Sequence, residues 1–342
     1  MKHIYNVILK SICIVLVFTL VGCSNGKEDD GLPSVINIGT QELPNEEMVA
    51  RINNYFEEEF GIPVNFMEFQ AGDIRIAMVS GDIDFAMLGS TNAILGVCNK
   101  MDVSLIWIHE IVGTSEQLIV QKDRNLNEIK DLKGKRLAAP LATTAHYSLV
   151  ETLKANGINE DEVTIYDMQM PEIYAAFLSG EIDGAYVWEP TVSKMKEIGK
   201  TLMTSEELAD QGIVTANVEI VRNEFMEKYP ELVEDYIRVV NESEIQMEED
   251  PQGVIPSLAK YLSLSEEDVK TIMDGSIRLN AKQMIEDQYL GTTTHKGKFL
   301  DSIIRTAYFL DDQRSLVETP DEKVLEEFVH PEFAEKIAKE MD

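Results

Sequence analysis

Two pairs of hydroxyl residues open predicted helices, and both pairs are candidate ligands for an anion. Ser90 and Thr91 precede an apolar stretch, and Thr143 and Thr144 begin a stretch with helical periodicity. The first turn of a helix has backbone N–H groups without an intrahelical acceptor, and it carries the positive end of the helix dipole. Both helix starts are therefore candidate anion sites, although ordinary N-capping explains the same residues.

Trp188 and Glu189 follow a predicted strand and could form a second part of the same site. An indole ring offers an apolar wall to a short aliphatic ligand, and a carboxylate attracts a cationic group. Tyr147 and Tyr186 are secondary candidates for the wall. The other tryptophan, Trp107, lies in an apolar strand, so we expect it in the core.

Three more polar residues are candidates for ligand contact. Gln41 follows the first predicted strand, Glu116 begins a later one, and His146 lies inside the second hydroxyl-led helix. A structural role explains Gln41 and Glu116 equally well. Neither His146 nor His109 is part of a spacing typical of a metal site, so the sequence predicts no metal, cofactor or catalytic residue.

The elements that would position these residues contain a short repeat. The stretch SGDIDFAMLGS begins at Ser80, and SGEIDGAYVWEP begins at Ser179. In both, glycine lies where a helix pattern stops and a strand pattern starts, which suits a left-handed C-cap. Ligands of open α/β sheets bind beyond the carboxyl ends of strands, so the residues after each copy could face one another across a cleft. Composition alone could also produce two similar units.

Strand and helix patterns alternate from Ser34 to Ile198, which predicts an α/β architecture with mainly parallel sheets. From Glu224 onward the patterns are almost wholly helical. We expect no transmembrane segment after the N-terminus.

The sequence pattern at the N-terminus predicts a secretory signal peptide. Lys2 and Lys10 precede the apolar run from Ser11 to Val21, which is too short to span a membrane comfortably. The run ends at Cys23 in a bacterial lipobox-like sequence, so residues 1–22 are predicted to be a lipoprotein signal peptide and Cys23 its lipidation site. A plain signal peptide is the alternative. Residues 23–33 are small and charged, which predicts a flexible tether.

Charge and cysteine content limit the protein's class. The formal net charge of −31 repels polyanions, so nucleic acid is not an expected partner. With Cys23 lipidated, Cys98 is the one thiol left in the mature chain, and no intrachain disulfide can form. About 310 residues remain for the folded part, which is enough for two domains.

Several segments together resemble the taurine and aliphatic-sulfonate family of periplasmic solute-binding proteins. They are LGST at Leu88, GTSEQLIVQKD at Gly113, DLKGKRLAAPLATTAHYSL at Asp131 and SGEIDGAYVWEP at Ser179. The resemblance covers nearly the whole mature chain. Within the family, the TTAHYS and YVW segments point toward the taurine-binding members.

The resemblance implies a type II periplasmic-binding-protein fold, in which two α/β lobes joined by two crossing strands close on a ligand. Residues 34–112 with 222–342 would form lobe I, and residues 113–221 would form lobe II with the hinge strands. The protein would be a monomeric, extracytoplasmic, lipid-anchored component of an ABC importer. It would deliver taurine or a related sulfonate to the permease and ATPase subunits.

The sequence departs from the taurine-binding pattern in the segment TANVEIV. Asn217 occupies the position of an expected acid, and Glu219 brings a charge where none is expected. Both are candidate ligand-binding residues. One hypothesis is that Glu189 or Glu219 has taken over charge pairing with the ligand amine.

Two alternatives stay open at this point. The ligand could be an alkanesulfonate, a pyrimidine precursor, nitrate or a small amine. The same fold also includes thiamine-pyrimidine synthases, but these carry a cysteine-rich motif and lack a secretion signal, unlike this sequence.

Overall fold

The computed structural model describes residues 31–69 and 72–341. The predicted signal peptide (residues 1–22), the predicted lipidation site Cys23 and residues 24–30 of the predicted tether lie outside the described residues. Residues from Ser34 onward form one unit, which contains all the elements below. No helix in the described part of the chain is long and apolar enough to cross a bilayer.

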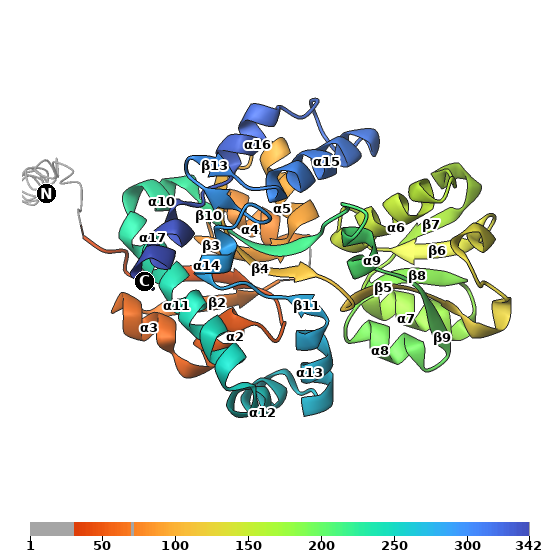
Figure 1. The fold of residues 1–342 in the computed structure, drawn as a ribbon, viewed down its shortest axis with the longest axis horizontal. Coiled ribbons are helices and arrows are strands. Elements are labelled where there is room, and N and C mark those ends of the chain that lie inside the picture. Colours follow the sequence, from red (N-terminus) through yellow and green to blue (C-terminus); the bar gives the residue numbers. More distant parts are fainter. Residues whose placement is uncertain (1–30, 70–71, 342) are drawn as a thin grey trace, which may run out of the picture. The chain divides into compact units, whose positions relative to one another are not determined.

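The first sheet has six strands in the order β11-β4-β10-β3-β1-β2 (Figure 1). Its strands are β1 (Ile36–Thr40), β2 (Val64–Glu68), β3 (Phe85–Gly89), β4 (Val103–Val112), β10 (Ala216–Arg222) and β11 (Ser276–Ile277). β1 pairs in parallel with β2 and β3, whereas β10 is antiparallel to β3 and β4. The sheet is therefore mixed rather than mainly parallel.

The second sheet has five strands in the order β7-β6-β8-β5-β9. They are β5 (Glu116–Gln121), β6 (Arg136–Ala139), β7 (Thr164–Asp167), β8 (Gly184–Trp188) and β9 (Gly199–Thr204). β6 is parallel to β7 and β8, and β5 is antiparallel to β8 and β9. A two-stranded ribbon of β12 (Gly291–Thr292) and β13 (His295–Lys296) completes the β structure described.

Helices join and cover the strands. Up to residue 228 they are α2 (Glu46–Asn53), α3 (Tyr55–Phe60), α4 (Asp73–Ser80), α5 (Ser90–Cys98), α6 (Thr144–Ala155), α7 (Met170–Ser179), α8 (Thr191–Lys196), α9 (Ser205–Ala209) and α10 (Asn223–Lys228). Short 3-10 helices lie at η1 (Lys122–Arg124), η2 (Ile129–Leu132) and η3 (Glu160–Glu162).

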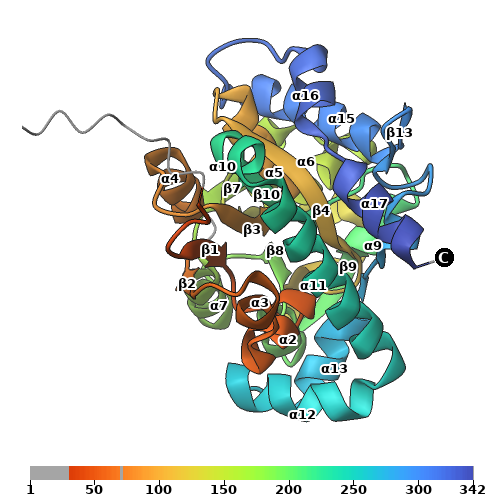
Figure 2. The same cartoon turned by 90° about the vertical axis from the view of Figure 1, so that its left-hand side faces the viewer.

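The chain after residue 228 is largely helical, as the sequence predicts. Its helices are α11 (Pro230–Glu249), α12 (Pro251–Leu262), α13 (Glu266–Asp274), α14 (Ala281–Met284), α15 (Phe299–Asp312), α16 (Glu322–Phe328) and α17 (Glu332–Glu340). α11 contacts α2 and α3, and α15 and α16 contact α5. Figure 2 shows α11 running across the side of the six-stranded sheet. The late helices thus pack on the elements of the first sheet.

The repeated Ser-Gly turn has the same structure in both copies. Gly81 ends α4 and Gly180 ends α7, with φ of 77° and 73°. An L-residue with a side chain rarely adopts this left-handed conformation, so glycine is the residue that stops each helix and turns the chain into the next strand.

The repeated aspartate also has the same role in both copies. Asp84 Oδ2 accepts a hydrogen bond from the Asn37 backbone N–H at 2.9 Å, and Asp183 Oδ2 accepts one from the Arg136 backbone N–H at 2.8 Å. Each carboxylate also pairs with an arginine, Asp84 with Arg222 at 2.7 Å and Asp183 with Arg136 at 3.1 Å. The repeat therefore ties each strand to its neighbour and is part of the scaffold.

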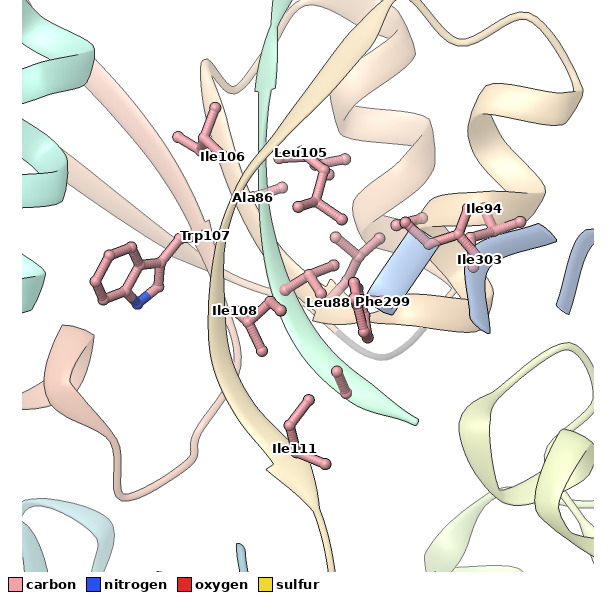
Figure 3. Packing of buried hydrophobic residues seen from close by; sticks show 14 of the residues in the cluster. Ala86, Leu88, Ile94, Leu105, Ile106, Trp107, Ile108, Ile111, Phe299 and Ile303 are labelled. Atoms are coloured by element: carbon pink, nitrogen blue, oxygen red, sulfur yellow. The ribbon is translucent and has the colours of Figure 1, made fainter. Parts of the chain in front are cut away.

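Trp107 belongs to the core, as predicted, and has no exposed surface. In Figure 3 its ring lies on the opposite side of β4 from the group that contains Leu88, Phe299 and Ile303. These residues all belong to the main hydrophobic cluster. β4 is therefore buried on both faces, as expected for a strand made almost wholly of apolar residues.

Two connections join the sheets. β4 leads to β5 through Gly113–Ser115, and β9 leads to β10 through α9 and residues 210–215. The sequence assigned residues 113–221 to lobe II together with the hinge strands, but β10 pairs with β3 and β4 of the first sheet. We therefore propose that the return crossing lies before residue 216.

Candidate functional site

A cavity lies where strands of both sheets end. It is lined by Gln41, Leu43, Gly89, Asn92, Glu110, Val112, Ser115, Glu116, Thr143, Thr144, Trp188, Glu189, Asn217 and Ile272. The space inside it that the centre of a water molecule can occupy is about 60 Å³, which is enough only for a small ligand. Seven of the lining residues are ones that the sequence singled out: Gln41, Glu116, Thr143, Thr144, Trp188, Glu189 and Asn217.

Two helices from different sheets begin at this cavity. Gly89 and Asn92 line it from the start of α5, which follows β3, and Thr143 and Thr144 line it from the start of α6, which follows β6. The starts lie close together, because a Cβ placed on Gly89 would be 3.3 Å from Thr144 Cγ2. The positive ends of two helix dipoles therefore meet at one place, which favours a bound anion.

The first turns differ in their caps. Thr143 Oγ1 caps α6 by accepting the His146 backbone N–H at 3.3 Å, as the capping explanation predicts. α5 begins after Gly89, which has no side chain to cap the first turn. Backbone donors of α5 are therefore without a side-chain acceptor from the N-cap position.

Apolar side chains cover another part of the lining. Leu43, Val112, Trp188 and Ile272 come from the segment after β1, from β4, from β8 and from α13. Trp188 is partly exposed, in contrast to the fully buried Trp107. The indole thus has surface available to a ligand.

Glu116 is buried at the start of β5 and receives hydrogen bonds from three hydroxyl groups. Thr144 donates to Oε2 at 2.7 Å, and Ser205 and Ser148 donate to Oε1 at 3.1 and 3.3 Å. Burial raises the pKa of Glu116 to about 7, although these hydrogen bonds lower it. Its contacts join β5 to the starts of α6 and α9.

Glu110, at the end of β4, is a lining carboxylate that the sequence analysis missed. Asn217 Nδ2 donates to Glu110 Oε1 at 2.7 Å, and the two residues face each other in the β4–β10 register. Burial raises the pKa of Glu110, while the hydrogen bonds from Asn217 and Ser276 lower it. The sequence signal was present, because a His-Glu pair interrupts the apolar run of β4 near its carboxyl end.

Glu189 lines the cavity, but its carboxylate is held by the next helix. Oε2 accepts the Ser193 backbone N–H at 3.0 Å, and Oε1 accepts the Ser193 hydroxyl at 2.9 Å. The Glu189 backbone N–H donates to Ser115 O at 2.9 Å. These contacts fix the chain between β8 and α8.

Four residues proposed from the sequence are not among the cavity's lining residues: Ser90, Thr91, His146 and Glu219. Ser90 Oγ accepts the Ala216 backbone N–H at 3.2 Å, and Thr91 is completely buried. His146 packs against Phe309, with ring centroids 5.4 Å apart, and burial lowers its pKa to about 4. A place in the first turn of a helix did not bring Ser90, Thr91 and His146 to the cavity, because Ser90 faces β10, Thr91 is buried and His146 faces α15.

Glu219 lies instead in a buried cluster around His109. His109 Nδ1 is 2.8 Å from Glu46 Oε1, and His109 Nε2 is 2.8 Å from Glu219 Oε2. Burial alone would lower the pKa of His109, but the Glu46 charge and the hydrogen bonds to both carboxylates raise it well above its usual value. Burial raises the pKa of Glu219 to about 8, although His109 lowers it.

Glu47 completes this cluster. It accepts hydrogen bonds from Thr40 and from the Tyr236 hydroxyl, the latter at 2.7 Å. Donor atoms of Glu47, His109 and Glu219 all lie within 4.8 Å of one another, as in metal sites. Both His109 nitrogens already have carboxylate partners, however, so protons explain the arrangement without a metal.

A family model described as NMT1/THI5 like matches residues 46–254, which is more than half of the chain. The chain belongs to the NMT1/THI5-like family. It is 34% identical over 272 residues to the taurine-binding periplasmic protein of Escherichia coli, covering 78% of this chain and 82% of that protein. It is 26% identical to a putative aliphatic sulfonates-binding protein of Bacillus subtilis, covering 84% of this chain and 88% of the relative. The predicted family relationship is therefore confirmed.

Solved structures share the fold. The alkanesulfonate-binding protein of Xanthomonas axonopodis pv. citri, bound to MOPS, has a TM-score of 0.71 and 20% identity, with 88% of this chain and 99% of that chain covered. The periplasmic aliphatic sulphonate binding protein of E. coli has a TM-score of 0.72 and 18% identity, with 86% and 92% covered. A desulfurization enzyme also matches, with a TM-score of 0.67, 16% identity, and 91% and 100% covered. The predicted type II periplasmic-binding-protein fold is confirmed.

Proposed function

We propose that this NMT1/THI5-like protein is the extracytoplasmic solute-binding component of an ABC importer. Its ligand would be taurine or a related small sulfonate, bound in the cavity between the two sheets. The observation that carries the proposal is the meeting of two helix starts, α5 and α6, at one cavity. The names of the relatives from E. coli and B. subtilis support the sulfonate class.

A sulfonate suits the two helix starts because it is a tetrahedral anion that stays charged at ordinary pH. It needs hydrogen-bond donors rather than a titrating partner, and first-turn backbone N–H groups supply them. The Thr143 and Thr144 segment and Asn92 would contribute further polar contacts. The aliphatic part would pack against Trp188 and the neighbouring apolar side chains.

Ligand binding would favour closure of the two lobes. The cavity takes residues from both sheets, so a ligand that contacts both stabilises the closed form over the open one. The shift is limited by the ligand's difference in affinity for the two forms. The closed protein would then deliver the ligand to a permease and its ATPase.

The anchor and the mature chain belong to the same proposal. Cleavage after residue 22 and lipidation of Cys23 would tether a monomer to the outer face of the cell membrane, with residues 24–33 as the spacer. Mass spectrometry of the mature N-terminus tests this part, and an unmodified Cys23 would contradict it.

Differential scanning fluorimetry over a ligand panel tests the function. The panel contains taurine, ethanesulfonate, nitrate, ethylamine and a hydroxymethylpyrimidine. A ligand at about 100 times its Kd stabilises the folded state by about 2.7 kcal/mol, which raises the melting temperature by several degrees. We expect this rise with at least one sulfonate.

The remaining compounds distinguish the other classes. If the pyrimidine or the amine raised the melting temperature and no sulfonate did, the proposed sulfonate ligand would be wrong. The desulfurization enzyme shares only the fold at 16% identity. Mass spectrometry can show whether taurine changes chemically when it is incubated with the protein. Such a change would contradict a binding role.

A further inference from the structure

The lining of the ligand cavity has an unbalanced charge. It includes three carboxylic residues, Glu110, Glu116 and Glu189, and no Lys, Arg or His. Like charges held close together in a partly buried space repel each other more strongly than they do in water. A ligand with only negative charge would meet this repulsion at any carboxylate that is ionised, so the cavity favours a ligand that also carries a positive charge.

The three carboxylates differ in their burial and in the hydrogen bonds that they already accept from the protein. Glu116 accepts hydrogen bonds from three hydroxyls, and both oxygens of Glu189 are bonded to Ser193. Both residues are at least nine-tenths buried. Glu110 is more exposed than either; it accepts the Asn217 amide on Oε1 and a hydrogen bond from Ser276, and it is attracted by the charge of Arg278. A carboxylate has about four acceptor sites, so Glu110 can take a further donor from the cavity side.

The strand register places Glu110 at a suitable distance from the anion site. Asn217 on β10 pairs with Gly89 at the start of α5 on one side and with Glu110 on the other. Neighbouring strands are about 4.8 Å apart, so the backbones of Gly89 and Glu110 are separated by roughly 10 Å. The Glu110 side chain shortens this span, which suits a ligand with a short chain between its anionic and cationic groups.

We propose that Glu110, oriented by Asn217, recognises an ammonium group on the ligand, so that the site selects a small amino-sulfonate over an amine-free sulfonate. This inference rests on the proposed function. It also explains the amide at position 217. The negative charge that would pair with the ligand amine lies on Glu110 of the adjacent strand, and Asn217 donates a hydrogen bond to it. Glu219 is excluded from this role by its place in the His109 cluster.

Isothermal titration of the purified protein with taurine and with ethanesulfonate tests the inference. The variants are Glu110→Gln, Glu110→Asp, and Glu267→Gln as a control that makes the same change in net charge at an exposed position on α13. Loss of a buried ion pair costs about 30-fold in affinity or more. We expect Glu110→Gln to lose about that factor for taurine, Glu110→Asp to lose less, and ethanesulfonate binding to stay the same or improve.

Each other outcome has a distinct meaning. Equal affinities for taurine and ethanesulfonate in the unmodified protein and in Glu110→Gln overturn the inference and leave the proposed function intact. A parallel loss of both ligands in Glu110→Gln, with unchanged melting temperature, shows a structural role and also overturns it. Failure of the unmodified, folded protein to bind either sulfonate overturns the proposed function itself.

Discussion

Glu116 combines deep burial with three hydroxyl donors, and this makes folding stability depend on pH. Burial raises its pKa from the ordinary value of 4.5 to about 7. A carboxyl group with a raised native pKa binds its proton more tightly in the folded state than in the unfolded state. Its contribution to stability is therefore complete below pH 4.5 and is lost as the pH rises through about 7.

We predict that Glu116→Gln flattens the pH dependence of unfolding. A shift from 4.5 to about 7 corresponds to about 3 kcal/mol of the free energy of unfolding. Urea unfolding at pH 5 and pH 8 should show a smaller difference in the variant than in the unmodified protein. Glu267→Gln is the control, and an unchanged slope in Glu116→Gln would contradict the raised pKa.

At the residue scale, the sequence predicted which side chains line the cavity better than it predicted their contacts. Trp188, Thr143 and Thr144 follow local signals, namely a strand end and a helix start. Glu110 was missed, since its place depends on pairing between β4 and β10, which are more than 100 residues apart in the sequence. The His-Glu pair in β4 marked a polar position, but the local sequence did not show which residues it would face.

At the level of elements, His109 links three parts of the first sheet. It lies on β4 between Glu46 at the start of α2 and Glu219 on β10, and all three side chains are essentially buried. Trp107 Nε1 also donates to Glu46 Oε1, at 3.1 Å. A buried imidazolium hydrogen-bonded to Glu46 and Glu219 holds these elements together only while all three groups are present.

We predict that His109→Ala is strongly destabilising. It leaves the buried Glu46 carboxylate without its cation and Glu219 without its hydrogen-bond partner, and breaking such a network costs about 3–5 kcal/mol. Combining it with Glu46→Gln and Glu219→Gln should recover part of the loss, because the uncompensated charges are then removed. Urea unfolding measures both variants, and equal stability of the single and triple variants would argue against a charged network.

The connection between the sheets is covered by a segment from far along the chain. Gly275, between α13 and β11, accepts the Ser115 backbone N–H at 3.0 Å. A Cβ at Gly275 would lie 2.8 Å from that nitrogen, so only glycine allows this approach. Ser115 lines the cavity, so the segment helps to position the site.

Gly275→Ala should therefore weaken ligand binding as well as stability. Overpacking of this kind costs about 1–3 kcal/mol, and displacement of Ser115 would reach the cavity. Gly72→Ala is the matched control, because a Cβ there meets no atom within 4 Å. Thermal unfolding and taurine titration of both variants test this; equal effects of the two substitutions would contradict the role of Gly275.

The sequence predicted most of the elements, but not how β10 pairs. Alternating patterns and the two Ser-Gly turns indicated the strands and helices up to Ile198, and the helical remainder was also correct. Residues up to 221, which include β10, were assigned to lobe II with the hinge strands, and the sheets were expected to be mainly parallel. An apolar strand buried on both faces has no alternation that reveals its neighbours or its direction.

For the whole molecule, the distribution of charge says more about the ligand than the net charge does. The formal charge of −31 keeps the chain soluble and opposes polyanions, yet it does not identify the ligand. The composition of the cavity supports the proposed class of ligand, because carboxylates and two helix starts lie in the same small space. A zwitterion with a short spacer satisfies both, and the closed form of the two lobes would be the form that holds it.

The two tryptophans provide the most direct test of a ligand in this cavity. Trp188 lines the cavity and Trp107 is fully buried in the core, so Trp107→Phe leaves Trp188 as the single indole of the chain. The measurement is the Trp188 emission of this folded variant during titration with taurine. We predict a saturable change in emission, and no such change in a variant that keeps Trp107 and replaces Trp188. Unchanged emission at taurine concentrations that raise the melting temperature would place the ligand elsewhere and contradict binding in this cavity.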